Sequence, residues 1–366
     1  MYFANVFKVL FVLNSVTAIN IRLISDTFCY YMKDCNIYVN KERVKYLKPD
    51  TSKVLQSSAD KMASGPELNT LYRPRSALAR ALLEKQRNDR SLRDSDKTEW
   101  YKVDKSRLSP ELQEKFVQLE PDEETKDFLT KCIEKSSWVW TQIWYLLAKT
   151  VLKYFWTITD INGWLGRGSM FVLSRAQAGS LIQAGDKTLE SVIDLGAGDG
   201  GVGKRFAGLF SQRYATEISA SMRNLLASKG YSILDAETWN ESRRFSCVCM
   251  LNLLDRCNKP RSMLSSAKKA LTEDGLLLIA LVLPYKPYVE VTADHKPEER
   301  LPIGGPTFED QVSSFIAFMK AEGWDVVAWT RTPYFCEGDF TQSYYWLDDS
   351  VYVFKLELPS CPVKPT

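Results

Sequence analysis

Acidic residues and closely spaced glycines stand together at one point of this chain, in Asp194-Leu-Gly-Ala-Gly-Asp-Gly200. Glycines allow a sharp backbone turn and leave space that a Cβ would fill, so the pattern predicts a buried strand, a tight turn and a helix. A second expected strand leads to Glu217, whose carboxylate can accept both hydroxyls of a ribose. Together the two segments predict an adenosine-containing cofactor at the carboxyl edge of a parallel sheet. The loop glycines of this site are Gly196, Gly198 and Gly200.

The identity of the cofactor depends on the acids of the glycine loop. Gly196, Gly198 and Gly201 also fit the G-x-G-x-x-G pattern of dinucleotide enzymes. Asp194 and Asp199 would repel a pyrophosphate, since anions prefer bare N–H groups at a helix N-terminus. The same acids suit a ligand with a sulfonium and an ammonium, so we expect S-adenosyl-L-methionine, with Asp194 near its methionine end. A plain glycine turn without a ligand is disfavoured, because such a turn needs only one glycine.

The composition sets limits on the remaining chemistry. The net charge of +3 over 366 residues implies no strong field for nucleic acid, and we expect none as a partner. The eight cysteines show no paired C-x-x-C spacing, and Cys247 and Cys249 fall on one face of an expected strand as core residues. The only histidine, His295, lies in a polar loop. This argues against a histidine-based metal site or catalytic triad, and we expect no metal.

The elements that must position these residues alternate between strand and helix from about residue 160 onward. This order predicts an α/β doubly wound sheet with an antiparallel last strand, the class I (Rossmann-like) seven-stranded fold, here with an N-terminal helical extension. The strands are expected at 192–195, 213–217, 232–234, 245–251, 276–283, 324–331 and 350–356. Helices before and beside the sheet are expected at 76–85, 110–118, 123–135, 138–156 and 174–182.

The expected helix at 138–156 is rich in tryptophan and tyrosine. Such a stripe favours an amphipathic helix packed on the catalytic domain, with a membrane-surface helix as the alternative.

Further candidate residues follow the ends of the expected strands. Asn252 and Asp255 come directly after the strand at 245–251, where residues line the ligand crevice of an open α/β sheet. Asn252 would lie near the sulfonium and Asp255 near the methyl acceptor. A helix N-cap is the alternative role for Asp255.

Three other segments carry candidate substrate contacts. The glycine-rich segment 161–171, with Arg167, either covers a ligand or is a plain connector. The segment 283–290, with Tyr288, is either a side wall for a planar acceptor or a rigid surface loop. The aromatic and acidic segment 332–349, with Tyr334 and Glu337, is expected to form a hairpin that folds back over the cofactor. Acids beside aromatics suit a basic or imidazole-containing acceptor.

Six of these segments, in order, resemble the methyltransferase-like protein nine (DREV) family of protein-histidine N-pros-methyltransferases. The resemblance runs from about Trp100 to Leu356 and does not extend through 21–97. The chain departs from the family at Gly201-Val-Gly203, where Glu-Val is usual, and this is expected to loosen the start of the following helix. The matching segments are 161–171, 194–200, 214–217, 251–257, 280–284 with 287–290, and 333–334 with 336–339.

The resemblance implies methylation of the pros nitrogen (Nδ1) of histidines in His-x-His segments of proteins, which forms 1-methylhistidine. It places Glu217, Asn252 and Tyr334 on the cofactor with the 194–200 loop, and Asp255 at the acceptor. Asp255 and Tyr334 are the expected catalytic residues. Another methyl acceptor, or a non-catalytic scaffold of the same fold, are the alternatives. The expected substrate contacts are Arg167, Asp255, Tyr288 and Glu337.

The domain plan places a signal peptide or anchor at 1–20 and a weakly ordered or peripheral segment at 21–97. A helical extension follows at 98–160, then the methyltransferase domain at 161–358 and a tail at 359–366. The apolar run 7–19 resembles a signal-peptide core and is too short for a standard membrane span, with a buried or interfacial helix as the alternative. We therefore expect the endoplasmic reticulum or another secretory or organellar compartment, with the mitochondrion or cytoplasm as alternatives. Membrane association would involve only the N-terminus, and the protein is expected to be a monomer.

Overall fold

The computed structural model describes residues 76–183, 188–241, 243–290 and 292–357. The chain divides into two compact units, 1–87 and 88–366. The described part of the first unit belongs to the start of α5 (Ala77–Asp94), which confirms the helix expected at 76–85 and extends it. The expectations for 1–20 and 359–366 lie outside the described residues, as does 21–75 of the expected peripheral segment.

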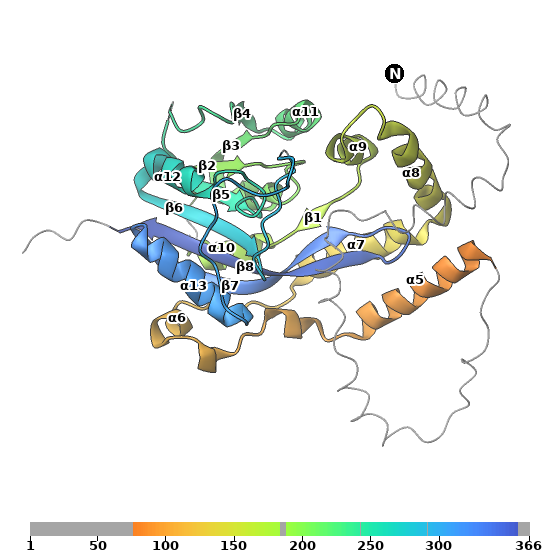
Figure 1. Ribbon diagram of the computed structural model, residues 1–366, viewed down its shortest axis with the longest axis horizontal. Helices are drawn as coiled ribbons and strands as arrows, with labels where there is room; N and C mark the ends of the chain where they lie inside the picture. The colour runs from red at the N-terminus through yellow and green to blue at the C-terminus, as the bar shows by residue number, and fades with distance from the viewer. Residues whose placement is uncertain (1–75, 184–187, 242, 291, 358–366) are drawn as a thin grey trace, which may run out of the picture. The chain divides into compact units, whose positions relative to one another are not determined.

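The second unit is built on one mixed sheet in the order β1-β7-β8-β6-β5-β2-β3-β4 (Figure 1). Within the run β4-β3-β2-β5-β6 each pair of adjacent strands is parallel, whereas β8 is antiparallel to both β6 and β7. Seven of the strands confirm the expected class I α/β fold, and β1 is an addition at the edge. The strands are β1 (Met170–Phe171), β2 (Leu189–Leu195), β3 (Phe210–Thr216), β4 (Ser232–Leu234), β5 (Phe245–Leu251), β6 (Leu271–Val282), β7 (Trp324–Glu337) and β8 (Tyr344–Leu356).

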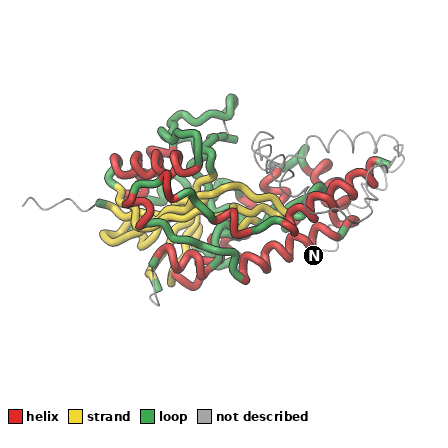
Figure 2. The backbone as a smooth tube through the Cα atoms, turned by 90° about the horizontal axis from the view of Figure 1, so that it is seen from below, coloured by secondary structure: helices red, strands yellow, loops and turns green. Residues whose placement is uncertain are grey.

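Helices cover both faces of the sheet, as the view from below in Figure 2 shows. Alternate residues of a strand point to opposite faces. β5 therefore places Val248 in one apolar cluster with α12 (Pro260–Ala270) and α13 (Phe308–Ala321), and Cys249 in the other with α7 (Glu123–Ser137) and α10 (Arg175–Ile182). Both faces are buried, which is why the central strands read as continuous apolar runs. Cys247 lies in the same cluster as Cys249, as expected.

The helices flank the strands in chain order. After α5 they are η1 (Lys97–Tyr101), η2 (Lys105–Arg107), α6 (Pro110–Glu114), α7 (Glu123–Ser137), α8 (Val139–Leu152), α9 (Ile158–Leu165), α10 (Arg175–Ile182), η3 (Gly203–Leu209), α11 (Ala220–Ser228), α12 (Pro260–Ala270) and α13 (Phe308–Ala321). The helix expected after the glycine loop is present as the 3-10 helix η3. Gly201 precedes it and Gly203 begins it, and glycine has a low propensity for the interior of an α-helix.

The segment before α7 is part of the sheet's packing. The helix expected at 110–118 ends at Glu114, and the chain then runs along β7. Val117 donates its backbone N–H to the Trp329 carbonyl at 2.8 Å, and the Trp329 indole donates to the Leu112 carbonyl at 2.8 Å. This pairing covers part of an edge that β7 would otherwise expose.

The aromatic helix expected at 138–156 is shorter in the structure and packs by one face only. Ala148 and Leu152 of α8 join Ile161 of α9 in a small apolar cluster. On the other face Trp140 is 83% exposed, and Tyr154, just beyond the end of the helix, is 76% exposed, so both interpretations of this helix stay open. Among the described residues, no helix has the length and apolar character needed to span a membrane.

The structure corrects the expected ends of the last two strands. The hairpin expected in 332–349 is present, because 332–337 continues β7 and pairs antiparallel with the start of β8, Glu337 opposite Tyr344. Its place over the cofactor stays a prediction. The two-residue strand β1 then pairs with the extension, Phe171 opposite Phe335. A strand this short has no period of its own in the sequence, so only the partner strand defines it.

Candidate functional site

The glycine loop at the carboxyl end of β2 combines packing with open space. Gly196, Gly198 and Gly200 all have left-handed φ angles, between +57° and +70°. A Cβ on Gly196 would lie 2.9 Å from Leu253, and one on Gly200 would lie 2.7 Å from Leu226. A Cβ on Gly198 would meet nothing within 4 Å. Two glycines therefore let the loop pack, and the third leaves room for a ligand.

The Asp194 carboxyl group is buried at the base of this loop, with the residue 5% exposed. Burial, together with the charge of Glu217, raises the pKa of Asp194 to about 7. A Cβ on Gly203 would lie 2.5 Å from Oδ2 of Asp194. Gly203, where the chain departs from the expected family pattern, is thus the residue that makes room for this carboxylate.

Glu217 joins the two segments that the sequence analysis placed together. Its Oε2 accepts from the Gly198 backbone N–H and its Oε1 from the Ser219 backbone N–H, both at 2.9 Å. Each carboxylate oxygen keeps a second lone pair for a ligand hydroxyl. The acid is therefore oriented by the glycine loop itself, directly after β3.

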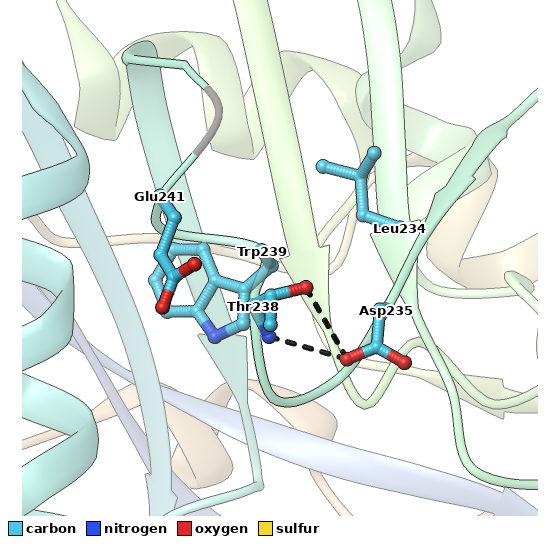
Figure 3. Close-up of a pocket in the computed structure, with 5 residues that line it drawn as sticks. All are labelled: Leu234, Asp235, Thr238, Trp239 and Glu241. Atoms are coloured by element: carbon cyan, nitrogen blue, oxygen red, sulfur yellow. Dashed lines mark hydrogen bonds between the residues drawn. The ribbon is translucent and has the colours of Figure 1, made fainter.

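A small pocket opens at the carboxyl end of β4, next to β3 in the sheet (Figure 3). Its volume is about 220 Å³. Asp235 accepts hydrogen bonds from the backbone N–H and the hydroxyl of Thr238, which folds the loop around the buried Trp239. The sequence analysis missed these residues, and a tryptophan in an otherwise polar loop was the only signal. The lining residues are Leu234, Asp235, Thr238, Trp239 and Glu241.

The half-buried Asn252, directly after β5, pairs with the buried Asp349 of β8. Asn252 has a left-handed φ of +56°, and its Nδ2 donates to Asp349 Oδ2 at 2.9 Å. The pKa of Asp349 is raised to about 8, chiefly by burial. The Asn252 hydrogen bond lowers this pKa and the charge of Asp255 raises it. Asp349 is a second missed residue, because it lies within β8, far from β5 in the sequence.

Asp255 lies three residues after Asn252 and is 2% exposed. Arg256 Nε lies 3.6 Å from Asp255 Oδ2. The backbone carbonyl of Asp255 accepts a hydrogen bond from the Tyr288 N–H at 2.8 Å. This contact ties the 283–290 segment to the acid, as a wall of the site would require. The Tyr288 ring stacks on the exposed His295, with centroids 4.5 Å apart.

Tyr334 reaches the same region from β7, where its hydroxyl donates to the sulfur of Met170. Burial raises the pKa of Tyr334 well above its usual value, and the charges of Asp349 and Asp255 add to the effect. The phenol therefore stays protonated across the physiological range. Asn252, Asp255 and Tyr334, three of the expected site residues, lie within electrostatic reach of Asp349.

Arg167 and Glu337 form a buried ion pair. Arg167 Nε lies 2.9 Å from Glu337 Oε1, with side chains 7% and 1% exposed. Lys135 Nζ lies 3.3 Å from the other Glu337 oxygen, and the Arg167 guanidinium stacks on the Tyr145 ring at 4.5 Å. The pair fixes segment 161–171 to the end of β7, and the substrate-binding roles of both residues stay predictions. Across the described ranges, no cluster of three or more His, Cys, Asp or Glu residues could hold a metal ion.

The family model for DREV methyltransferase matches residues 100–356, the range of the expected resemblance. The chain belongs to the DREV methyltransferase family. The matched range includes the glycine loop and the loops after β3 and β5. It also includes the 100–160 region in the family domain, in line with the packing of Trp100 and Tyr101 against the sheet.

Solved methyltransferases are similar to this DREV protein at low identity. The glycopeptide N-methyltransferase MtfA complexed with S-adenosyl-L-methionine is 16% identical, with 50% of this chain and 88% of that chain covered and a TM-score of 0.35. The DhpI complex with S-adenosylhomocysteine is 14% identical, with 60% and 97% covered and a TM-score of 0.34. The N-methyltransferase NodS from Bradyrhizobium japonicum is 13% identical, with 50% and 86% covered and a TM-score of 0.33.

Proposed function

We propose that this DREV methyltransferase uses S-adenosyl-L-methionine to methylate the pros nitrogen (Nδ1) of histidines in His-x-His segments of proteins. The observation that carries the proposal is the buried Asp255, which follows Asn252 after β5 and whose charge, with that of Asp349, acts on Tyr334. The family model that matches the chain is that of the DREV methyltransferases. The acceptor itself is an inference from the family resemblance and from the chemistry of the acid.

The residues of the loop fit the cofactor. The Asp194 carboxyl is buried with a raised pKa, so a cationic partner such as the methionine ammonium would stabilise its ionised form. The remaining lone pairs of the Glu217 carboxylate suit the ribose hydroxyls. The empty space at the Cβ position of Gly198 leaves room for the cofactor. When bound, S-adenosyl-L-methionine supplies an electrophilic methyl group on a sulfonium.

Asp255 determines which imidazole nitrogen is the nucleophile. An imidazole with a pKa near 6.5 is largely neutral at physiological pH and needs no strong base. If Asp255 accepts from Nε2–H, the lone pair lies on Nδ1. The carboxylate also stabilises the positive charge that develops on the ring, and Tyr334, which stays protonated, offers a donor beside it. Alignment within the site then supplies most of the rate.

The test is methyl transfer from labelled S-adenosyl-L-methionine to a peptide with Ala-His-Ala-His repeats, beside a matched peptide in which each His is Ala. We expect transfer to the first peptide alone. Transfer to neither peptide, with cofactor binding intact, would contradict the histidine acceptor and leave the methyltransferase assignment standing.

A further inference from the structure

The pairing of Asn252 with Asp349 determines which end of an amide faces the site. Asp349 is fully buried on β8, and its Oδ2 accepts from Asn252 Nδ2 at 2.9 Å. Asn252 Oδ1 and Asp349 Oδ1 are also buried, and neither has a hydrogen-bond partner among the described residues. The Asn252 Nδ2 therefore donates one hydrogen bond within the pair, and the Asn252 Oδ1 is left as an acceptor.

An ionised carboxylate fixes the amide, because it is acceptor-only and can face only the NH2 end. A neutral acid preserves this orientation when its proton lies on Oδ1 and Oδ2 accepts. The observed hydrogen bond is thus compatible with both forms. Because the NH2 end faces Asp349, the carbonyl oxygen must point elsewhere. A buried acceptor without a donor costs about 1–3 kcal/mol, which a ligand N–H would recover.

We propose that Asp349 is a positioning residue of the methyl-transfer site, which orients the Asn252 amide so that its Oδ1 accepts a hydrogen bond from an N–H donor of the bound ligand. Two ligands offer such a donor: the ammonium of the cofactor and the ring N–H of an acceptor imidazole. The second source rests on the proposed function, whereas the first requires only the cofactor. Asp349 itself touches neither ligand and acts through Asn252.

The test is a set of exchanges at the two positions. Asp349→Asn keeps the shape of the side chain but can present either an oxygen or an NH2 to Asn252, so it no longer dictates the amide orientation. Asn252→Asp alone places two carboxyl groups face to face. The double exchange, Asn252→Asp with Asp349→Asn, restores an NH2-to-carboxyl hydrogen bond in reverse and still leaves an acceptor oxygen at position 252.

The matched control is Asp348→Asn, one residue earlier on β8. Asp348 pairs with Arg331 at a partly exposed position, so its loss removes an ion pair of the same strand without touching Asn252. Every variant is checked for cooperative thermal unfolding. The readouts are the dissociation constant of S-adenosylhomocysteine by calorimetry, with no acceptor present, and kcat and KM for the histidine peptide.

We expect Asp349→Asn to raise either the dissociation constant or KM by about 5- to 20-fold, the scale of one lost buried hydrogen bond. The double exchange should return to within about threefold of the wild type. A rise in the dissociation constant identifies the cofactor as the donor, and a rise in KM alone identifies the imidazole.

Two results would overturn the proposal. One is an Asp349→Asn variant that behaves like Asp348→Asn in both constants. The other is a folded double variant whose loss in the dissociation constant or KM equals the product of the losses in the two single variants, which would show that the two residues act independently. If the wild type does not methylate the peptide, the proposed acceptor fails, and the S-adenosylhomocysteine constants decide this proposal alone. If Asp349→Asn does not fold, the double exchange is compared directly with Asn252→Asp.

Discussion

At the scale of single residues, the site holds carboxyl groups whose surroundings set different tasks. Asp194 and Asp349 are buried with raised pKa values, and Glu217 is held by two backbone N–H groups. The sequence predicts Asp194 and Glu217 because Asp194 lies at the end of a recognisable strand and Glu217 directly follows one. It does not predict a site role for Asp349, because an acid in an aromatic-rich strand segment is expected to face solvent.

The pH dependence of cofactor affinity follows from Asp194. With a pKa of about 7 in the free protein, this carboxyl is protonated below that pH, and a cationic ligand favours its ionised form. Binding therefore releases a proton, and affinity should rise as pH rises from 5.5 to 7.5, by up to about tenfold per unit. Calorimetry with S-adenosylhomocysteine measures this. Asp194→Asn should bind more weakly and lose the dependence, and a flat wild-type profile would contradict the assignment.

Asp255→Asn tests the acceptor side of the site. The amide can donate as well as accept, so it no longer fixes the imidazole tautomer or stabilises a positive ring. We expect kcat on the histidine peptide to fall by about 10²–10⁴-fold, the range of a positioned acid–base group, with S-adenosylhomocysteine affinity little changed. Near-normal kcat would exclude this role for Asp255.

At the scale of elements, the site depends on loops at one edge of the sheet. The sequence predicts β2 to β6 and their loops well, because buried parallel strands are continuous apolar runs with glycine turns between them. It cannot predict the extension of β7 and β8, where the order of aromatic and acidic residues resembles a loop. Only the pairing of β7 with β8 and β1 defines that extension.

Gly198→Ala tests whether the space beside the glycine loop holds the ligand, as distinct from the backbone strain that alanine brings. Gly198 has a φ of +57°, and no atom lies within 4 Å of its Cβ position, so alanine should lower stability by only about 1–2 kcal/mol. Cofactor affinity should fall at least about tenfold, because the methyl enters the ligand space. The control is Gly323→Ala at the start of β7, with a φ of +79° and no neighbour closer than 4.0 Å. Equal affinity in the two variants would contradict a ligand at Gly198.

Glu337→Gln tests the buried ion pair as a structural lock. Removing the charge leaves Arg167 buried without its counter-charge, so unfolding free energy should fall by about 3–5 kcal/mol. Asp127→Asn removes the exposed pair with Lys131 and should change it by less than about 1 kcal/mol. Denaturant unfolding of both variants measures the difference. A Glu337→Gln variant of normal stability with weakened peptide binding would instead support the predicted substrate role.

At the scale of the whole molecule, the second unit combines both apolar clusters, the sheet and every site residue described. The domain assignment from sequence separates 98–160 from the catalytic part. Residues of the 98–160 segment contact distant parts of the chain, such as Trp100 against Phe335. Sequence patterns alone do not reveal this packing of the segment against the sheet. Contacts between segments more than 200 residues apart leave no local period.

The stability of the ligand-free protein should fall as pH rises from about 5 to 8. Asp194 and Asp349 hold protons in the folded state that the unfolded chain releases near pH 4, so the folded state binds more protons in this window. Each group lowers the unfolding free energy by up to about 1.4 kcal/mol per pH unit until its own folded pKa is reached. Thermal unfolding across this range measures the fall. Asp349→Asn should flatten it, and an equally steep fall in that variant would contradict the effect.

The most direct test of the account is the identity of the methylated nitrogen. After reaction of the wild-type protein with a histidine peptide, acid hydrolysis and separation of the methylhistidine isomers assign the product. The account predicts 1-methylhistidine, the pros isomer, as the product, because Asp255 holds Nε2–H and leaves Nδ1 as the nucleophile. Predominance of 3-methylhistidine, the tele isomer, would contradict it.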